Sequence, residues 1–401
     1  MYKHLNICNI YIFIWVLYIF HWQNLGEAFP VLEILSNVFL GINLTISIYY
    51  TCVFLLKYRQ TIFFKSLNVL LFSFIFYGSI SVLTRDYVGI NGTKIPSLTY
   101  LIGALRTFLP IYTCFVFTKL GYISEKTIRF WSWIFFMQCI YIFFISRFVY
   151  LGIDSSDFGE LRTNNTAYLF VSVFPLFYFH KNRPIVQYIF IAISLFLSFM
   201  SVKRGAIFIV TLSTLYFFIH TLKSASVKIK ILSVVALLIL VALGTDFVTN
   251  LYENSNVFQH RFEQTLEGNV SNRDQIAAYL FNIYASSDLL QTLFGFGADG
   301  TLEYGLYAHN DWLEMLFDQG IWGFTLFLCF WLIILKHWRN QSGSKNNLAF
   351  FLGLWIICNL TRTFFSMWYS VANIYVTMPL GYYLANISIE REKILNNKTK
   401  M

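Results

Sequence analysis

The stretch "ILSVVALLILVALGTD", residues 231–246, decides the fold class, because it carries no charged side chain before its last residue. The hydrocarbon core of a bilayer is about 30 Å thick, and an α-helix crosses it with roughly 20 mainly apolar residues. Outward from this stretch, similar apolar runs recur along the whole chain with short polar breaks between them. We count twelve, at 6–21, 31–56, 66–84, 98–118, 130–146, 166–180, 184–201, 205–221, 231–246, 313–335, 347–366 and 369–387.

The composition agrees with a membrane protein. The 401 residues are 57% hydrophobic and only 12% charged, where a soluble domain has about 25% charged residues. We therefore predict an all-α, polytopic transmembrane bundle of about twelve spans. The segments around 166–221 are short, and their breaks "HKNRP" and "VKRG" hold few residues. Alternatively, two of these segments are re-entrant and do not cross the membrane.

The net charge of +9 would suit a nucleic-acid partner in a soluble protein, so the position of the basic residues decides its meaning. With both termini in the cytoplasm, nineteen of the 29 basic residues fall in cytoplasmic segments, as the positive-inside rule predicts. We therefore expect a multi-pass membrane protein that binds membrane lipid and no nucleic acid. Eight of the ten remaining basic residues are arginines, whose planar fork suits bidentate capture of phosphate or carboxylate. The outer surface is thus predicted to hold an anion.

Only one external connection is long, and it divides the chain into three parts. We assign membrane helices one to nine to 1–246, a long external, periplasmic-side loop to 247–312, and membrane helices ten to twelve with a cytoplasmic tail to 313–401. Within the loop, apolar residues at helical spacing predict an amphipathic helix over 272–285. We expect it to lie on the membrane surface with its apolar face down.

The end of this loop gathers ionisable side chains directly before an apolar helix. In "YAHNDWLEMLFDQGIWG", residues 307–323, His309, Asp311 and Glu314 fall within the first turns of that helix. A histidine titrates near pH 6.5 and can accept a proton at neutral pH. A single histidine at a membrane boundary is more often a packed or hydrogen-bonded bystander, and that reading remains the alternative.

Four features together resemble the O-antigen ligase and polymerase family: "SVKRGA" (201–206), the long outer loop, "FGFG" (294–297) and "HNDWLEMLFDQGIWG" (309–323). The resemblance covers roughly residues 160–335. It implies a protein of the bacterial inner membrane that takes glycan from an undecaprenyl-diphosphate carrier and joins it to a glycan acceptor at the outer face. The residues that match the family's histidine and arginines are His309 and Arg204, with Arg261, Arg273 and Arg162 as less secure matches.

The chemistry of such a transfer assigns roles to these residues. We expect His309 to act as the general base, with Glu314 or Asp311 orienting it. We expect Arg204, Arg261, Arg273 and Arg162 to stabilise the charge on the leaving diphosphate. The nearest metal-binding pattern, "DSSD" (154–157), has unsuitable spacing, so we expect no metal or other cofactor. A single displacement of this kind inverts the anomeric centre.

Four functions remain open at this stage. The preferred one is a polymerase of O-antigen, capsule or exopolysaccharide repeat units, for which a chain-length regulator is a further candidate partner. The second is an O-antigen ligase that transfers finished polymer to a lipid A core. The third is a transporter or flippase for a lipid-linked or anionic solute, although the charges gather on one face instead of the midplane. The fourth is a structural membrane component in which the arginines are anchors and His309 is a bystander.

Overall fold

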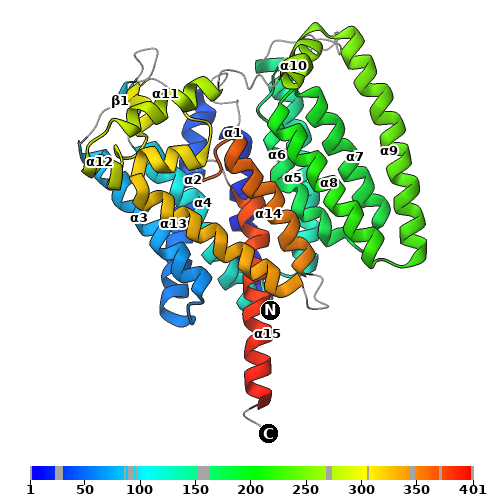
Figure 1. Cartoon of the computed structure of the whole chain (residues 1–401). Coiled ribbons are helices and arrows are strands. Elements are labelled where there is room, and N and C mark those ends of the chain that lie inside the picture. Colours follow the sequence, from blue (N-terminus) through cyan, green and yellow to red (C-terminus); the bar gives the residue numbers. More distant parts are fainter. Residues whose placement is uncertain are drawn as a thin grey trace.

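The computed structural model is a bundle of helices with one small hairpin (Figure 1). It describes residues 2–22, 30–84, 87–88, 94–95, 98–150, 163–267, 273–304, 307–342, 348–369 and 373–398. The α-helices are α1 (Tyr2–Trp22), α2 (Pro30–Lys57), α3 (Ile62–Thr84), α4 (Leu98–Lys119), α5 (Glu125–Ile145), α6 (Ala167–Val173), α7 (Pro184–Met200), α8 (Arg204–Ser224), α9 (Val227–Asn254), α10 (Asn256–Leu266), α11 (Arg273–Ala285), α12 (Leu289–Phe294), α13 (Asp311–Ser342), α14 (Leu348–Phe365) and α15 (Ile374–Lys398). The remaining elements are the helical turns η1 (Ser146–Tyr150), η2 (Phe174–His180) and η3 (Gly300–Tyr304), and the antiparallel strands β1 (Tyr87–Val88) and β2 (Lys94–Ile95).

The predicted all-α, polytopic membrane fold is confirmed. Among the described residues, eight helices are long and apolar enough to cross a membrane, and three shorter apolar helices accompany them at Ile7–Phe20, Ala167–His180 and Pro184–Met200. Each of the twelve predicted stretches coincides with helix over most of its length. The count of twelve crossings stays a prediction, because it depends on whether the shorter helices and α15 also cross.

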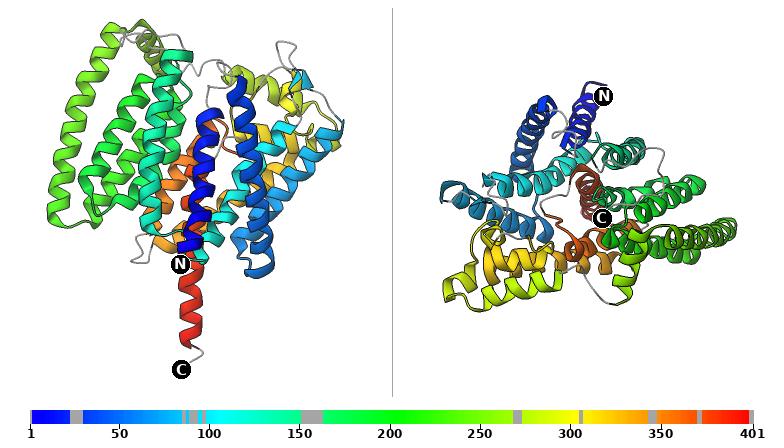
Figure 2. Two further views of the ribbon diagram at one scale, coloured as in Figure 1. Left: turned by 180° about the vertical axis from the view of Figure 1, so that it is seen from behind. Right: turned by 90° about the horizontal axis from the view of Figure 1, so that it is seen from above.

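The helices form two groups with α14 and α15 between them (Figures 1 and 2). One group contains α1 to α4 and α13, and the other contains α5 to α9. The start of α1 and the end of α15 lie at the same end of the bundle, whereas α10, α11 and α12 lie at the opposite end. We call these the termini end and the loop end.

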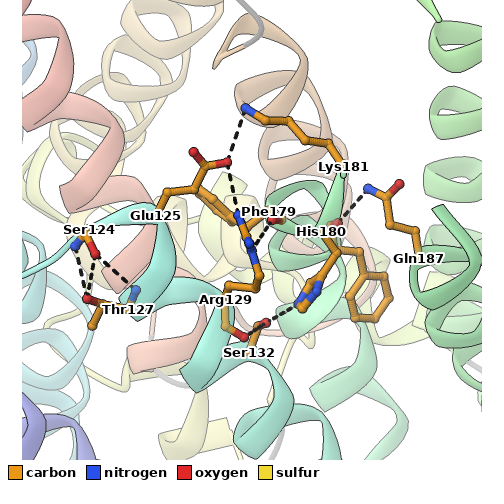
Figure 3. Close-up of polar contacts among 10 residues, drawn as sticks. Ser124, Glu125, Thr127, Arg129, Ser132, Phe179, His180, Lys181 and Gln187 are labelled. Atoms are coloured by element: carbon orange, nitrogen blue, oxygen red, sulfur yellow. Dashed lines mark hydrogen bonds and ion pairs between the residues drawn. The ribbon is translucent and has the colours of Figure 1, made fainter. Parts of the chain in front are cut away.

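Contacts at the termini end hold the start of α5 against the end of η2 (Figure 3). The Glu125 carboxylate pairs with Lys181 at 3.2 Å, and the Nε of Arg129 donates to the carbonyl oxygen of Phe179 at 3.0 Å. The ring of His180 bonds the hydroxyl of Ser132 at 2.7 Å. Because η2 continues directly from α6, these contacts also help fix α6, which carries site residues at the loop end.

Helix α9 is the least buried of the eight candidate membrane spans among the described residues. Its only buried side chains are those of Ser233 and Leu251, and the hydroxyls of Ser233 and Tyr188 lie 2.6 Å apart. Large exposed aliphatic side chains such as Leu238 and Leu243 run along the rest of α9. An exposed apolar surface of this size is compatible with a bilayer and not with water.

Helix α13 is broken at Gly320, where the backbone adopts φ 63° and ψ −161°. The continuous helix predicted over 313–335 is therefore wrong at this point. The reason is a close backbone contact with Gly295, whose φ is 79°. A Cβ at Gly320 would overlap the backbone of Leu293 and Gly295, and one at Gly295 would overlap the backbone of Asp318.

The predicted amphipathic helix at 272–285 exists as α11, but its apolar face packs on protein. Leu280 and Tyr284 are buried in a cluster with Phe296 and Phe317, and Ile276 packs against it. The prediction that this face lies on the membrane is wrong, because the first part of α13 offers an apolar surface that sequence periodicity does not reveal. The predicted loop boundaries also shift, since α9 continues to Asn254 and α13 starts at Asp311.

Candidate functional site

A cavity of about 230 Å³ at the loop end gathers positive charge and one histidine. We call it the cationic cavity. It lies where the starts of α6, α8 and α11 meet the end of α14. Its lining residues are Asn165, Tyr168, Leu169, Ser172, Lys203, Arg273, His309, Arg362, Ser366, Met367 and Asn373. No carboxylate occurs among these described lining residues, so its charge favours an anionic ligand.

Hydrogen bonds and a ring contact hold the two lining arginines in place. The Nη1 of Arg362 donates to the hydroxyl of Ser172 at 2.9 Å, and its guanidinium lies 5.2 Å from the ring centroid of Tyr168. The Nη1 of Arg273 donates to the carbonyl oxygen of Phe365 at 2.9 Å, as does the hydroxyl of Tyr168 at 3.1 Å. The guanidinium groups are therefore positioned before any ligand arrives, which is the condition for strong electrostatic stabilisation.

Lys203 lies among the positive charges that the sequence singled out. Burial, followed by the charges of Arg273, Arg261 and Arg204 in that order, lowers its pKa to about 8. Three of the four predicted diphosphate-binding arginines thus contribute to the lowered pKa of Lys203. Arg273 also lines the cationic cavity, whereas Arg204 and Arg261 lie around it without lining it. The fourth, Arg162, falls outside the described residues.

His309 lines the cationic cavity in a left-handed backbone conformation, with φ 52°. Burial lowers the pKa of its imidazole, and the charges of Arg273 and Lys203 lower it further. The ring is therefore neutral at neutral pH and can accept a proton, which is the state that a general base needs.

The carboxylates near His309 bind backbone amides and one hydroxyl. Glu314 Oε1 accepts from the amide of Ala308 at 2.6 Å, and its Oε2 accepts from Thr301 at 2.9 Å. Asp311 Oδ2 accepts from the amide of Trp368 at 2.7 Å. Both carboxylates thus bind chain segments beside the site. Glu314 binds the segment that directly precedes His309. In the described contacts neither of them hydrogen-bonds the imidazole.

Backbone strain concentrates around the same site. Val202, Asp299 and His309 are the non-glycine residues with positive φ among the described part of the chain, at 51°, 52° and 52°. Such conformations each cost on the order of 1–3 kcal/mol and persist where the surrounding structure fixes them. Val202 precedes Lys203, and Asp299 lies at a neighbouring cavity.

This second cavity, of about 310 Å³, adjoins the first at Met367, which lines both. We call it the aromatic cavity. Its lining residues are Tyr18, Ser36, Asn37, Leu40, Thr99, Tyr100, Ile102, Gly103, Arg106, Asp299, Tyr307, Met367 and Tyr369. The Oδ2 atom of Asp299 and the hydroxyl of Tyr369 are buried without a hydrogen-bond partner. Burial raises the pKa of Asp299 to about 7. In the described structure these two polar atoms remain open to a hydrogen bond with water or a ligand.

Sequence reasoning missed Lys203 and Arg362 as site residues. Arg362 lies in an apolar segment, where a helix-end arginine ordinarily extends to the lipid headgroups. Only the packing of α14 against α6 turns it toward Tyr168 and Ser172. The sole signal in the sequence was the excess of arginine among the external cations.

Comparison with protein families bears on the same region. A family model described as O-antigen ligase matches residues 189–328. Residues 189–328 are thus similar to an O-antigen ligase domain. This matched segment contains Lys203, Arg273 and His309, whereas Tyr168 and Arg362 join the cationic cavity from outside it. A search of curated proteins found no match to the chain. The match over residues 189–328 and the apolar helices of the described residues support a multi-pass membrane protein that is similar to the O-antigen ligase family.

Proposed function

We propose that the chain polymerises the repeat units of a surface polysaccharide by transferring glycan from undecaprenyl diphosphate to an acceptor sugar hydroxyl. The observation that carries this proposal is the cationic cavity, in which three cations and a neutral histidine face one space. The match of residues 189–328 to the O-antigen ligase family model supports a glycan transfer of this kind. We place the reaction at the outer face of the bacterial inner membrane, with both termini in the cytoplasm.

Lys203, Arg273 and Arg362 supply the charge that the donor requires. When the bond from the anomeric carbon to the carrier breaks, its electron pair stays on the diphosphate oxygen. Fixed cations around that oxygen stabilise the developing charge without reorganising. Arg204 and Arg261 add to the positive potential from outside the cavity, since both act on Lys203.

His309 accepts the proton of the acceptor hydroxyl as that oxygen bonds to the anomeric carbon. A general base of this kind contributes about 10² to 10⁴ in rate. One displacement inverts the anomeric centre and leaves a protonated His309 and the carrier diphosphate. Burial and the neighbouring cations, which keep the imidazole neutral before the reaction, also favour loss of this proton afterwards.

We assign the acceptor glycan to the aromatic cavity. Its tyrosine rings offer flat apolar faces, and Asp299 and Tyr369 offer unpaired polar atoms, which is the mixture that sugar rings bind. The two cavities meet at Met367, so an acceptor held in one can present a hydroxyl to a donor held in the other.

Ligation of finished polymer to a lipid A core is the second candidate, and the description of the matched family favours it. Both reactions use the same donor and base and differ only in the acceptor. A transporter would place its ionisable site near the midplane, whereas both cavities described here lie at the loop end.

The test uses purified protein in lipid nanodiscs with a defined undecaprenyl-diphosphate repeat unit, and products are separated by size. Wild type is expected to form a ladder from this donor alone. His309→Ala should lower the rate by about 10² to 10⁴ while donor binding persists. Lys203→Ala should weaken donor binding, and Lys223→Ala, an exposed lysine at the termini end, should change neither.

Each other outcome has a defined meaning. Transfer only after a lipid A core acceptor is added would identify a ligase. Full activity of His309→Ala would show that His309 is not the general base, and this would contradict the proposed mechanism.

A further inference from the structure

A third cavity, of about 510 Å³, lies at the termini end, far along the bundle from the cationic cavity. It opens between the α2–α3 connection, the last turns of α13 and α15. Its lining residues are Arg59, Gln60, Thr61, Ile62, Phe63, Phe64, Ile333, Lys336, His337, Asn340, Leu384, Ile387, Ser388, Arg391 and Glu392. None of these residues lines either cavity at the loop end.

The lining is apolar on one side and basic on the other. Phe63, Leu384 and Ile387 are buried and form part of the apolar wall. Arg59, Lys336 and Arg391 are exposed and come from three elements far apart in the sequence. A cavity of this kind combines a surface for an acyl chain with cations for a phosphate.

The acidic residue of the lining does not cancel this charge. The Oε1 atom of Glu392 lies 2.7 Å from Nζ of Lys119, so the carboxylate is already paired with a lysine outside the cavity. The positive charge of Arg59, Lys336 and Arg391 is therefore available to a ligand.

Exposed apolar side chains also lie at this cavity. Ile62 lines it and is 72% exposed, and nearby Leu56 is 86% exposed, although both are large apolar side chains. Other basic residues at this end, such as Lys223 and Lys228 around the α8–α9 turn, line none of the three cavities. The convergence of cations on a cavity with exposed apolar side chains thus goes beyond the general basic character of this end.

We propose that this cavity binds one anionic phospholipid, with its phosphate among Arg59, Lys336 and Arg391 and an acyl chain along Phe63 and Leu384. Basic pockets between transmembrane helices on the cytoplasmic side suit anionic headgroups. A phospholipid here joins α3, α13 and α15, which the cavity otherwise separates. The site does not depend on the reaction proposed for the loop end.

The experiment measures lipid binding by native mass spectrometry of detergent-solubilised protein. Phosphatidylglycerol and phosphatidylcholine with the same acyl chains are titrated separately. Arg59→Ala/Arg391→Ala is compared with Lys223→Ala/Lys228→Ala, which removes the same charge from the same end. We expect the cavity double variant to bind phosphatidylglycerol about tenfold or more weakly, with the control pair unchanged. Arg59→Lys/Arg391→Lys should restore most of the affinity, which excludes a folding defect as the cause.

Two results of the lipid titrations, and one of a phosphate titration, would overturn the proposal. One is equal loss of phosphatidylglycerol in both double variants, which would mean general surface attraction. The other is equal affinity for the two lipids, which would mean a site for acyl chains alone. Inorganic phosphate is added in a separate titration, and full displacement of the lipid by millimolar phosphate would identify a free-phosphate site instead.

Discussion

At the scale of single residues, the site places a weak base beside a lysine of lowered pKa. His309 and Lys203 line the same cavity, and each is influenced by Arg273. Burial, and after it the repulsion between positive charges, lowers both pKa values, so that between them lies a pH range with neutral imidazole and charged ammonium. This is the combination of states that proton abstraction and diphosphate binding need together.

The pH dependence of kcat/KM should report these two groups in the free protein. His309 must be neutral, so activity falls only below its ordinary pKa of about 6.5. Lys203 is charged below its pKa of about 8, so donor capture should weaken as the pH rises through that value. Lys203→Arg keeps the charge to far higher pH and should abolish the alkaline fall. An unchanged alkaline limb in this variant would show that Lys203 does not hold the donor.

Glu314 allows a test of positioning against proton transfer. Its two oxygens accept hydrogen bonds from Ala308 and Thr301. Glu314→Gln keeps one acceptor oxygen and should retain more activity than Glu314→Ala, with the larger change in kcat. If both variants lose activity equally and the acid limb of kcat/KM moves, Glu314 itself takes part in proton transfer.

The residue scale also shows where sequence reasoning stops. His309 could be predicted from its motif, because its charged neighbours precede an apolar run. Tyr168, Lys203 and Arg362 could not be grouped, since they are far apart in the chain and meet only through the packing of α6, α8 and α14. A local pattern identifies a candidate base but not the cations that surround it.

At the scale of elements, the break in α13 is what brings the loop and the helix together. The amides of Phe296 and Gly297 donate to the carbonyl oxygens of Phe317 and Asp318 at 2.8 and 2.9 Å. The break frees these carbonyl groups from the helix and offers them to the "FGFG" segment. Periodicity predicted this helix but not its interruption, because a glycine in an apolar run is also tolerated in a straight membrane helix.

Adding a Cβ at either glycine should therefore separate the two segments. We expect Gly320→Ala and Gly295→Ala each to destabilise the protein by about 2 kcal/mol and to lower transfer, since both residues have positive φ and meet backbone. Gly244→Ala is the control, because its added Cβ meets nothing within 4 Å. Thermal unfolding in detergent measures all three.

The double variant Gly295→Ala/Gly320→Ala tests the same contact in a second way. Once one alanine has separated the segments, the other should add less than its own single effect. Fully additive destabilisation would mean that the two glycines do not share a contact.

At the scale of the whole molecule, composition predicts the membrane class, whereas the arrangement of helices requires the structure. Apolar side chains such as Leu238 on α9 face outward, and others such as Phe351 on α14 lie in the core. Lipid and protein interior are equally apolar, so the sequence does not distinguish these two faces. The two cavities of the loop end depend on that arrangement and were not predictable.

The proposed orientation predicts opposite labelling of the two ends. Asp274→Cys on α11 should react with a membrane-impermeant maleimide in intact cells, and Lys228→Cys on α9 should react only after lysis. The parent chain, with its six cysteines, is the background control. The reverse pattern would place the cationic cavity on the cytoplasmic side.

Helix α9 connects this site to a property of the surrounding membrane. Its 28 residues span roughly 42 Å, well beyond the hydrocarbon thickness of about 30 Å. A helix of this length tilts more in a thin bilayer than in a thick one. In its last turns Leu251 belongs to the same buried apolar cluster as Val202, the residue with positive φ next to Lys203. We therefore expect the rate of glycan transfer to change with the acyl-chain length of the surrounding lipid.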